Sequence, residues 1–186
     1  MSYYSIALFL HIVGALGFFV ALGLEWTSLR HLRLATTVEQ VREWLRIPTE
    51  MGRVEMISMV ILLASGIFMM ITVWHGVAWI FVALGSLVPI SVLAMAVGRP
   101  RMKAIERSLA AEHGTISPTL HQLLHHPLLR IDIQTRIAIA LGIVFLMSVK
   151  PDLIVSLLTI GVAIIIGLAS SLPLRDRERT QEKSSA

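Results

Sequence analysis

The sequence contains no cysteine and few charged residues. The absence of cysteine excludes disulfide bonds, thiolate metal sites, iron–sulfur clusters and covalently attached c-type haem. Charged residues make up 15% of the 186 residues and hydrophobic residues 55%, whereas soluble domains contain roughly 25% charged residues. A core formed by so short a chain is too small to bury this much apolar side chain. Lipid must solvate the rest, so the composition predicts an integral membrane protein.

Five apolar runs are long enough to cross the ~30 Å hydrocarbon core of a membrane as helices. We predict transmembrane helices over residues 4–24, 56–74, 77–97, 131–149 and 153–172. Shorter amphipathic helices are expected over residues 38–47, 101–113 and 118–126. Pro48 is expected to end the first of these short helices, and Pro127 the last. The predicted fold is an all-α membrane bundle, with residues 1–174 as one domain and residues 175–186 as a charged, disordered tail.

Basic residues divide unevenly between the two sides of this bundle. The connections after the first and third runs and the tail each contain at least four arginines or lysines, whereas the two other turns contain only Lys150. The positive-inside rule therefore predicts an N-terminus outside and a C-terminus in the cytoplasm of a bacterial inner membrane. Because the basic residues flank the spans, we expect them to meet anionic lipids and not nucleic acid.

His11 is an ionisable residue inside the first run, about seven residues or ~10 Å below its outer end. A side chain of this kind is costly at that depth, so a functional role is the first interpretation. A neutral imidazole can ligate haem iron or another metal, or relay a proton. The alternative is a structural histidine that forms a hydrogen bond to a neighbouring helix.

Three more residues are candidates for the same site. Antiparallel helices would bring Met69 and Met70 to the depth of His11, with His75 at the outer turn above them. Met69 or Met70 is a candidate second axial ligand to a b-type haem, and a histidine with methionines also suits copper. The alternative roles are apolar packing for the methionines and a solvated turn for His75.

A second histidine pair is predicted on the cytoplasmic side. His121 and His125 are four residues apart on one helix face, a spacing that lets two imidazoles share a metal. No carboxylate with matching spacing accompanies them. The alternative is a surface helix whose histidines lie among lipid headgroups.

Acidic residues gather near the inner ends of the predicted spans. We expect Glu25, Glu50 and Glu55 to form one cluster there, and Asp132 to pair with Arg136 four residues later. Mutual pairing explains these residues, although they would also suit a proton entry route or a quinone headgroup site.

Several short segments resemble known membrane proteins. Residues 9–15, Phe-Leu-His-Ile-Val-Gly-Ala, resemble the first helix of a bacterial family of small integral membrane proteins of unknown function. Ser65-Gly66 with the later Trp74 and Trp79, and residues 135–138 leading to residues 147–151, are also similar to that family.

The first helix is also similar to that of bacterial membrane protoporphyrinogen oxidases of the HemJ type and copper-resistance membrane proteins of the CopD type. This resemblance implies that His11 binds haem. The oxidases also carry a lysine shortly after a tryptophan in a later helix, and the stretch after Trp79 contains none. The resemblance therefore implies haem binding rather than the oxidase reaction.

Three functions remain open at this point. The first is a redox protein that binds haem b or a metal at His11, with quinone as a partner. The second is a non-catalytic accessory subunit of a larger membrane complex or a homo-oligomer, for which small residues would permit close helix contact. The third is a copper-handling or small-solute transport protein. Hydrolase motifs are absent from the sequence, and whether the protein is an enzyme stays open.

Overall fold

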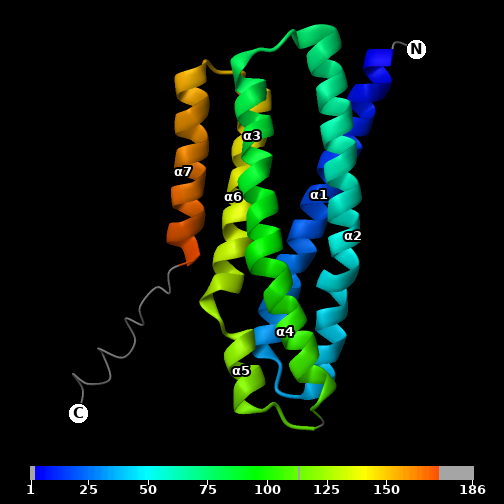
Figure 1. The fold of residues 1–186 in the computed structure, drawn as a ribbon, viewed down its shortest axis with the longest axis vertical. Coiled ribbons are helices and arrows are strands. Elements are labelled where there is room, and N and C mark those ends of the chain that lie inside the picture. The colour runs from blue at the N-terminus through cyan, green and yellow to red at the C-terminus, as the bar shows by residue number, and fades with distance from the viewer. Residues whose placement is uncertain (1–2, 113, 172–186) are drawn as a thin grey trace, which may run out of the picture.

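The computed structural model describes residues 3–112 and 114–171, and this part of the chain is helical apart from its connections (Figure 1). Five helical segments within it are long and apolar enough to cross a membrane. The predicted all-α architecture is thereby confirmed, and five helices have the length and the apolar composition that the predicted spans require. The predicted tail, residues 175–186, lies outside the described residues.

The two longest α-helices come first. They are α1 (Tyr3–Leu34) and α2 (Val38–Met69), and α2 continues into the π-helical segment η1 (Met70–Trp74). In the same way, α3 (Ala78–Leu93) passes through the π-helical segment η2 (Ala94–Gly98) into α4 (Arg99–Ala110). The remaining described helices are α5 (Pro118–Leu124), α6 (Pro127–Val149) and α7 (Leu153–Ser171).

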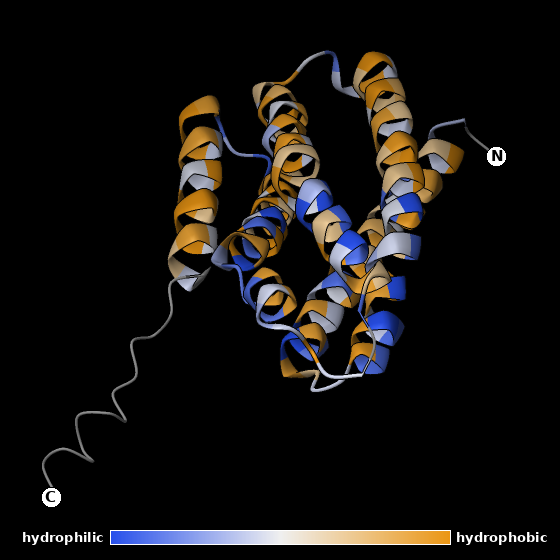
Figure 2. Cartoon of the chain, turned by 60° about the horizontal axis from the view of Figure 1, so that its bottom comes forward, coloured by the Kyte–Doolittle hydropathy of each residue, from blue (hydrophilic) through white to orange (hydrophobic). Residues whose placement is uncertain are grey.

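The spans form two groups. Helix α1 packs along α2, whereas α6 packs against both α7 and α3 (Figure 1). We call the end of the bundle with the N-terminus and the turns after η1 and α6 the upper end. The lower end contains α4, α5 and the connection between α1 and α2. Hydrophobic residues dominate the upper parts of the helices, and hydrophilic residues become frequent toward the lower end (Figure 2).

Pro48 does not end a separate helix, contrary to the prediction for residues 38–47, because α2 runs through it. Proline has no N–H group with which to bond the carbonyl four residues earlier, which here belongs to Trp44. That carbonyl instead accepts a 2.6 Å hydrogen bond from the Ser28 hydroxyl of α1. A neighbouring helix thus satisfies the group that proline leaves free, and α2 remains continuous.

Two other predicted boundaries also differ from the structure, each for its own reason. Helix α1 does not stop at residue 24 but continues to Leu34, and its extension buries Leu29 and Leu32 against the lower core. Pro127 does not end α5; it occupies the first turn of α6, directly after the capping residue His126. This is a position that proline tolerates well, because the N–H group it lacks would have no partner there.

Helix α7 approaches α6 closely at one glycine. A methyl group on Gly167 would lie 2.6 Å from the backbone Cα of Thr135, so only glycine fits at this crossing. By contrast, a methyl group on Gly161 of the same helix would meet nothing within 4 Å. The two positions therefore form a matched pair for testing how α7 docks.

We expect Gly167→Ala to lower the stability of the folded bundle by about 1–3 kcal/mol, because backbone atoms of α6 cannot rotate out of the way. Gly161→Ala should leave stability unchanged or raise it by up to about 1 kcal/mol through helix propensity. Thermal unfolding in detergent measures both variants. Equal losses in the two variants would contradict the close crossing.

Candidate functional site

A cavity of about 270 Å³ lies between the α1–α2 pair and helices α3 and α6, in the upper half of the bundle. This volume is close to the lower end of small-molecule sites, which span roughly 300–1,000 Å³. Its walls are mostly aliphatic and aromatic, and His11 and Lys150 are the basic residues among the described residues that line it. Leu8 and Val144 line it while remaining 38% and 41% exposed, so the cavity opens to the outside of the bundle.

The hydrogen bonds of His11 indicate which ring nitrogen holds the lone pair. Nδ1 lies 3.1 Å from the hydroxyl oxygen of Ser65, and that hydroxyl donates its single proton to the Ile61 carbonyl at 2.5 Å. With the Ser65 proton on the Ile61 carbonyl, the matching tautomer has the ring proton on Nδ1, which donates it to Ser65. In this tautomer Nε2 holds the lone pair, and the ring also has a hydrogen bond with the Leu62 backbone. A neutral imidazole in this tautomer can act as a ligand through Nε2.

Glycines let the imidazole and its helix come close to α2. A methyl group on Gly66 would lie 3.3 Å from Cε1 of His11, so the ring packs directly over this glycine. Further along α1, a methyl group on Gly14 would lie 3.2 Å from the backbone oxygen of Ser58, and one on Gly17 would lie 2.5 Å from its hydroxyl. This close packing fixes the ring on the wall of the cavity.

The structure brings most of the predicted outer residues together. Met69 and Met70 line the same cavity as His11, and the change from α-helix to π-helix falls between the two methionines. Single π-helical turns occur frequently at functional sites. His75 is exposed in the turn after η1, in the left-handed conformation with φ 44°, and it is not one of the lining residues. Cofactor binding by these residues stays a prediction.

Lys150 is a cavity residue that the sequence analysis treated only as a marker of topology. Its ammonium group lies 4.3 Å from the centre of the Trp74 ring, and Trp79 packs edge-on against that ring at 5.8 Å. All three residues line the cavity. Lys150 directly follows α6 in the left-handed conformation, with φ 53°, and the cavity residues Ala140 and Met147 lie on the helix before it.

The structure does not support the predicted metal site formed by His121 and His125 at the lower end. The rings of His121 and His125 stack with centroids 4.1 Å apart and planes 21° from parallel. Nδ1 of His125 is also engaged with the His121 carbonyl at 3.0 Å. Among residues 3–112 and 114–171, no group of three histidine, aspartate or glutamate residues is placed to hold a metal ion.

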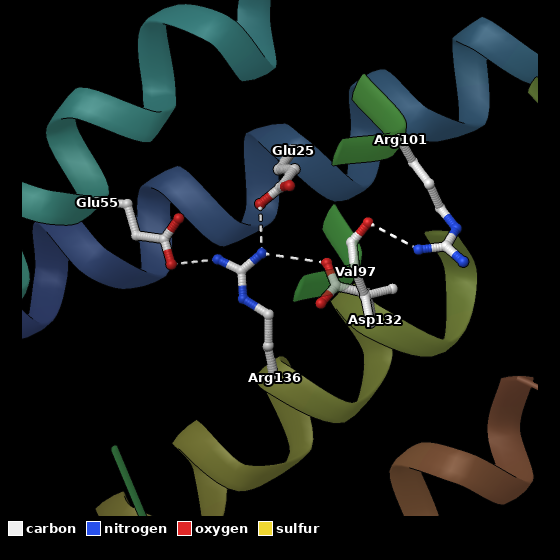
Figure 3. A network of polar contacts seen from close by, with 6 residues as sticks. All are labelled: Glu25, Glu55, Val97, Arg101, Asp132 and Arg136. Carbon is white, nitrogen blue, oxygen red and sulfur yellow. Dashed lines mark hydrogen bonds and ion pairs between the residues drawn. The ribbon is translucent and has the colours of Figure 1, made fainter. Parts of the chain in front are cut away.

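A buried ion-pair network lies below the cavity (Figure 3). Arg136 of α6 is 1% exposed. Its Nη1 lies 3.1 Å from a carboxylate oxygen of Glu25 and 3.4 Å from Asp132, and its Nη2 contacts Glu55. One guanidinium thus joins α1, α2 and α6. The predicted pairing of Asp132 with Arg136 is confirmed.

The predicted acidic cluster is only partly correct. Glu25 and Glu55 converge on Arg136, but Glu50 lies elsewhere and forms an exposed pair with Arg46 at 2.7 Å. The sequence could not show this division because Arg136 is 111 residues from Glu25 and 81 residues from Glu55. Only the Asp132 contact has a local helical spacing.

No protein-family model, no curated protein and no solved structure matches this chain significantly. Its function therefore has to be inferred from the cavity and the network.

We expect Arg136→Met to destabilise the protein by about 3–5 kcal/mol, because it leaves buried carboxylates without their cation. Arg46→Met removes an exposed pair and should change stability little. Thermal unfolding of the two variants in the same detergent provides the comparison. Equal unfolding temperatures for Arg136→Met and Arg46→Met would show that the network does not hold the three helices together.

Proposed function

We propose that this chain is a multi-pass protein of the bacterial inner membrane that binds haem b through His11 and takes part in electron transfer. The observation that carries the proposal is the His11 imidazole on the wall of an apolar cavity, with Nδ1 beside the Ser65 hydroxyl. In this proposal the upper end faces outward, as the distribution of basic residues indicates. The resemblance of the first helix to haem-binding membrane proteins agrees with this assignment.

The surroundings of His11 suit an axial ligand. Histidines that bind metals generally donate their second ring N–H to a polar partner, which fixes both the tautomer and the ring orientation. The Ser65 hydroxyl plays that part for Nδ1, at 3.1 Å. The imidazole is then held in the one state that can bind iron without first losing a proton.

The cavity walls also suit a porphyrin. The mostly aliphatic and aromatic lining would solvate the macrocycle, and the opening beside Leu8 and Val144 would let an occupant extend beyond the enclosed volume. The thioethers of Met69 and Met70, which line the same cavity, would be candidates to hold the iron together with His11, and Lys150 would offer a cation to a propionate carboxylate. Bound haem would supply one-electron redox chemistry. The chain's own residues would hold it and exclude water.

Copper is the second candidate, and the methionines favour it. Met69, Met70 and Met147 line the cavity together with His11. Thioether and imidazole ligands select Cu(I). A copper-handling role would use the same histidine nitrogen, so the two candidates share a site and differ in what fills it.

Purified wild-type protein supplied with haem should show a Soret band that His11→Ala abolishes. Ser65→Ala should keep the band but raise the haem dissociation constant by roughly 10–100-fold, because the partner of Nδ1 is lost. His31→Ala is the control, since His31 stacks on Trp44 at 3.9 Å, away from the cavity.

Metal analysis of the same samples separates the candidates. Copper that co-purifies in a His11-dependent manner, without a Soret band, would favour the copper role. Protein that binds neither haem nor copper would refute the assignment of His11 as a ligand.

A further inference from the structure

The ion-pair network contains more acid than base (Figure 3). Three carboxyl groups, those of Glu25, Glu55 and Asp132, surround the guanidinium of Arg136. The further cation that faces Asp132 is Arg101 of α4, whose guanidinium donates to the Val97 carbonyl at 3.1 Å. Full ionisation would leave one negative charge without a partner among buried side chains, and an uncompensated buried charge is very costly.

The geometry singles out Asp132 as the carboxyl with the weakest pairing. Its contact with Arg136, at 3.4 Å, is longer than the 3.1 Å contact of Glu25. Its other oxygen, Oδ1, is buried and has no hydrogen-bond partner within residues 3–112 and 114–171. The Asp132 side chain is also the least exposed to solvent of the three, at 2% against 18% for Glu25 and for Glu55. A buried carboxylate oxygen without a donor makes the ionised form costly, and protonation removes that charge.

Asp132 lies on the lower side of the network, close to the start of α6. The backbone of η2 passes directly over it, since a methyl group on Gly98 would lie 2.8 Å from Oδ2. This glycine ends a π-helical segment, a type of distortion that is common at functional sites. Toward the upper end, the same face of α6 continues through Arg136 to Ala140, which lines the cavity.

We propose that Asp132 is a proton-binding site that exchanges one proton with the lower face of the membrane. In this exchange an O–H bond forms at Oδ1 and an O–H bond of hydronium or a protonated buffer breaks, and no electrons are transferred. Binding brings the total charge of the three carboxyl groups, Arg136 and Arg101 from −1 to zero, and leaves Arg136 in contact with Glu25 and Glu55. The site does not depend on haem or copper binding, because none of its residues lines the cavity.

Infrared difference spectroscopy of the full-length protein in lipid tests the proposal. Spectra recorded between mildly acidic and alkaline pH should contain the carbonyl stretch of a protonated carboxylic acid, which loses intensity as the pH rises and shifts in D₂O. Asp132→Asn should remove this band. Asp152→Asn is the matched control, because the Asp152 side chain is exposed and caps the next helix by accepting from Val155 N at 2.9 Å.

Isotope labelling keeps the test decisive if Asp132→Asn fails to fold. The sequence contains only three aspartates, at positions 132, 152 and 176. In a protein with Asp152→Asn and Asp176→Asn, carbon-13 aspartate labels Asp132 alone and should shift the band. A band that does not shift with the carbon-13 label would assign the proton to another residue and overturn the proposal. The same conclusion would follow if Glu25→Gln removed the band and Asp132→Asn retained it. The absence of any such band from wild-type protein would also overturn it.

Discussion

The guanidinium of Arg136 connects three helices that are distant in the sequence, and the shape of the bundle follows from that connection. It contacts Glu25 of α1, Glu55 of α2 and Asp132 on its own helix while being 1% exposed. A buried charge of this kind is tolerated only when its partners stay in place. The α1–α2 pair and the group of α3, α6 and α7 are thereby tied together in the lower half of the molecule.

The upper half lacks a comparable link among the described residues, and the cavity lies there. Its walls come from α1 and α2 on one side and from α3 and α6 on the other. The contacts that hold each pair internally are close, as at Gly17 against Ser58. Mostly apolar side chains, with His11 and Lys150, lie between the two groups above Arg136, and this is where the bundle has room for a ligand.

The sequence was sufficient for features that depend on local pattern, and insufficient for those that depend on contacts between distant helices. Hydropathy located the five spans, and antiparallel counting placed Met69 and Met70 near His11. The continuity of α2 through Pro48 could not be predicted from the sequence, because the Trp44 carbonyl accepts its hydrogen bond from Ser28 of another helix. The spacing of charges along the sequence likewise predicted the pair of Asp132 with Arg136. It could not predict that Glu25 and Glu55, which are distant in the sequence, complete the network.

His11 and the ion-pair network are the two polar features of the bundle, and α1 connects them. His11 and Glu25 are 14 residues, or two heptads, apart on this helix and therefore lie on nearly the same face. The ion pair of Glu25 with Arg136 fixes the rotation of α1 about its axis. That rotation in turn directs the His11 ring toward Ser65 and the cavity. The network thus sets the geometry of a site that it does not touch.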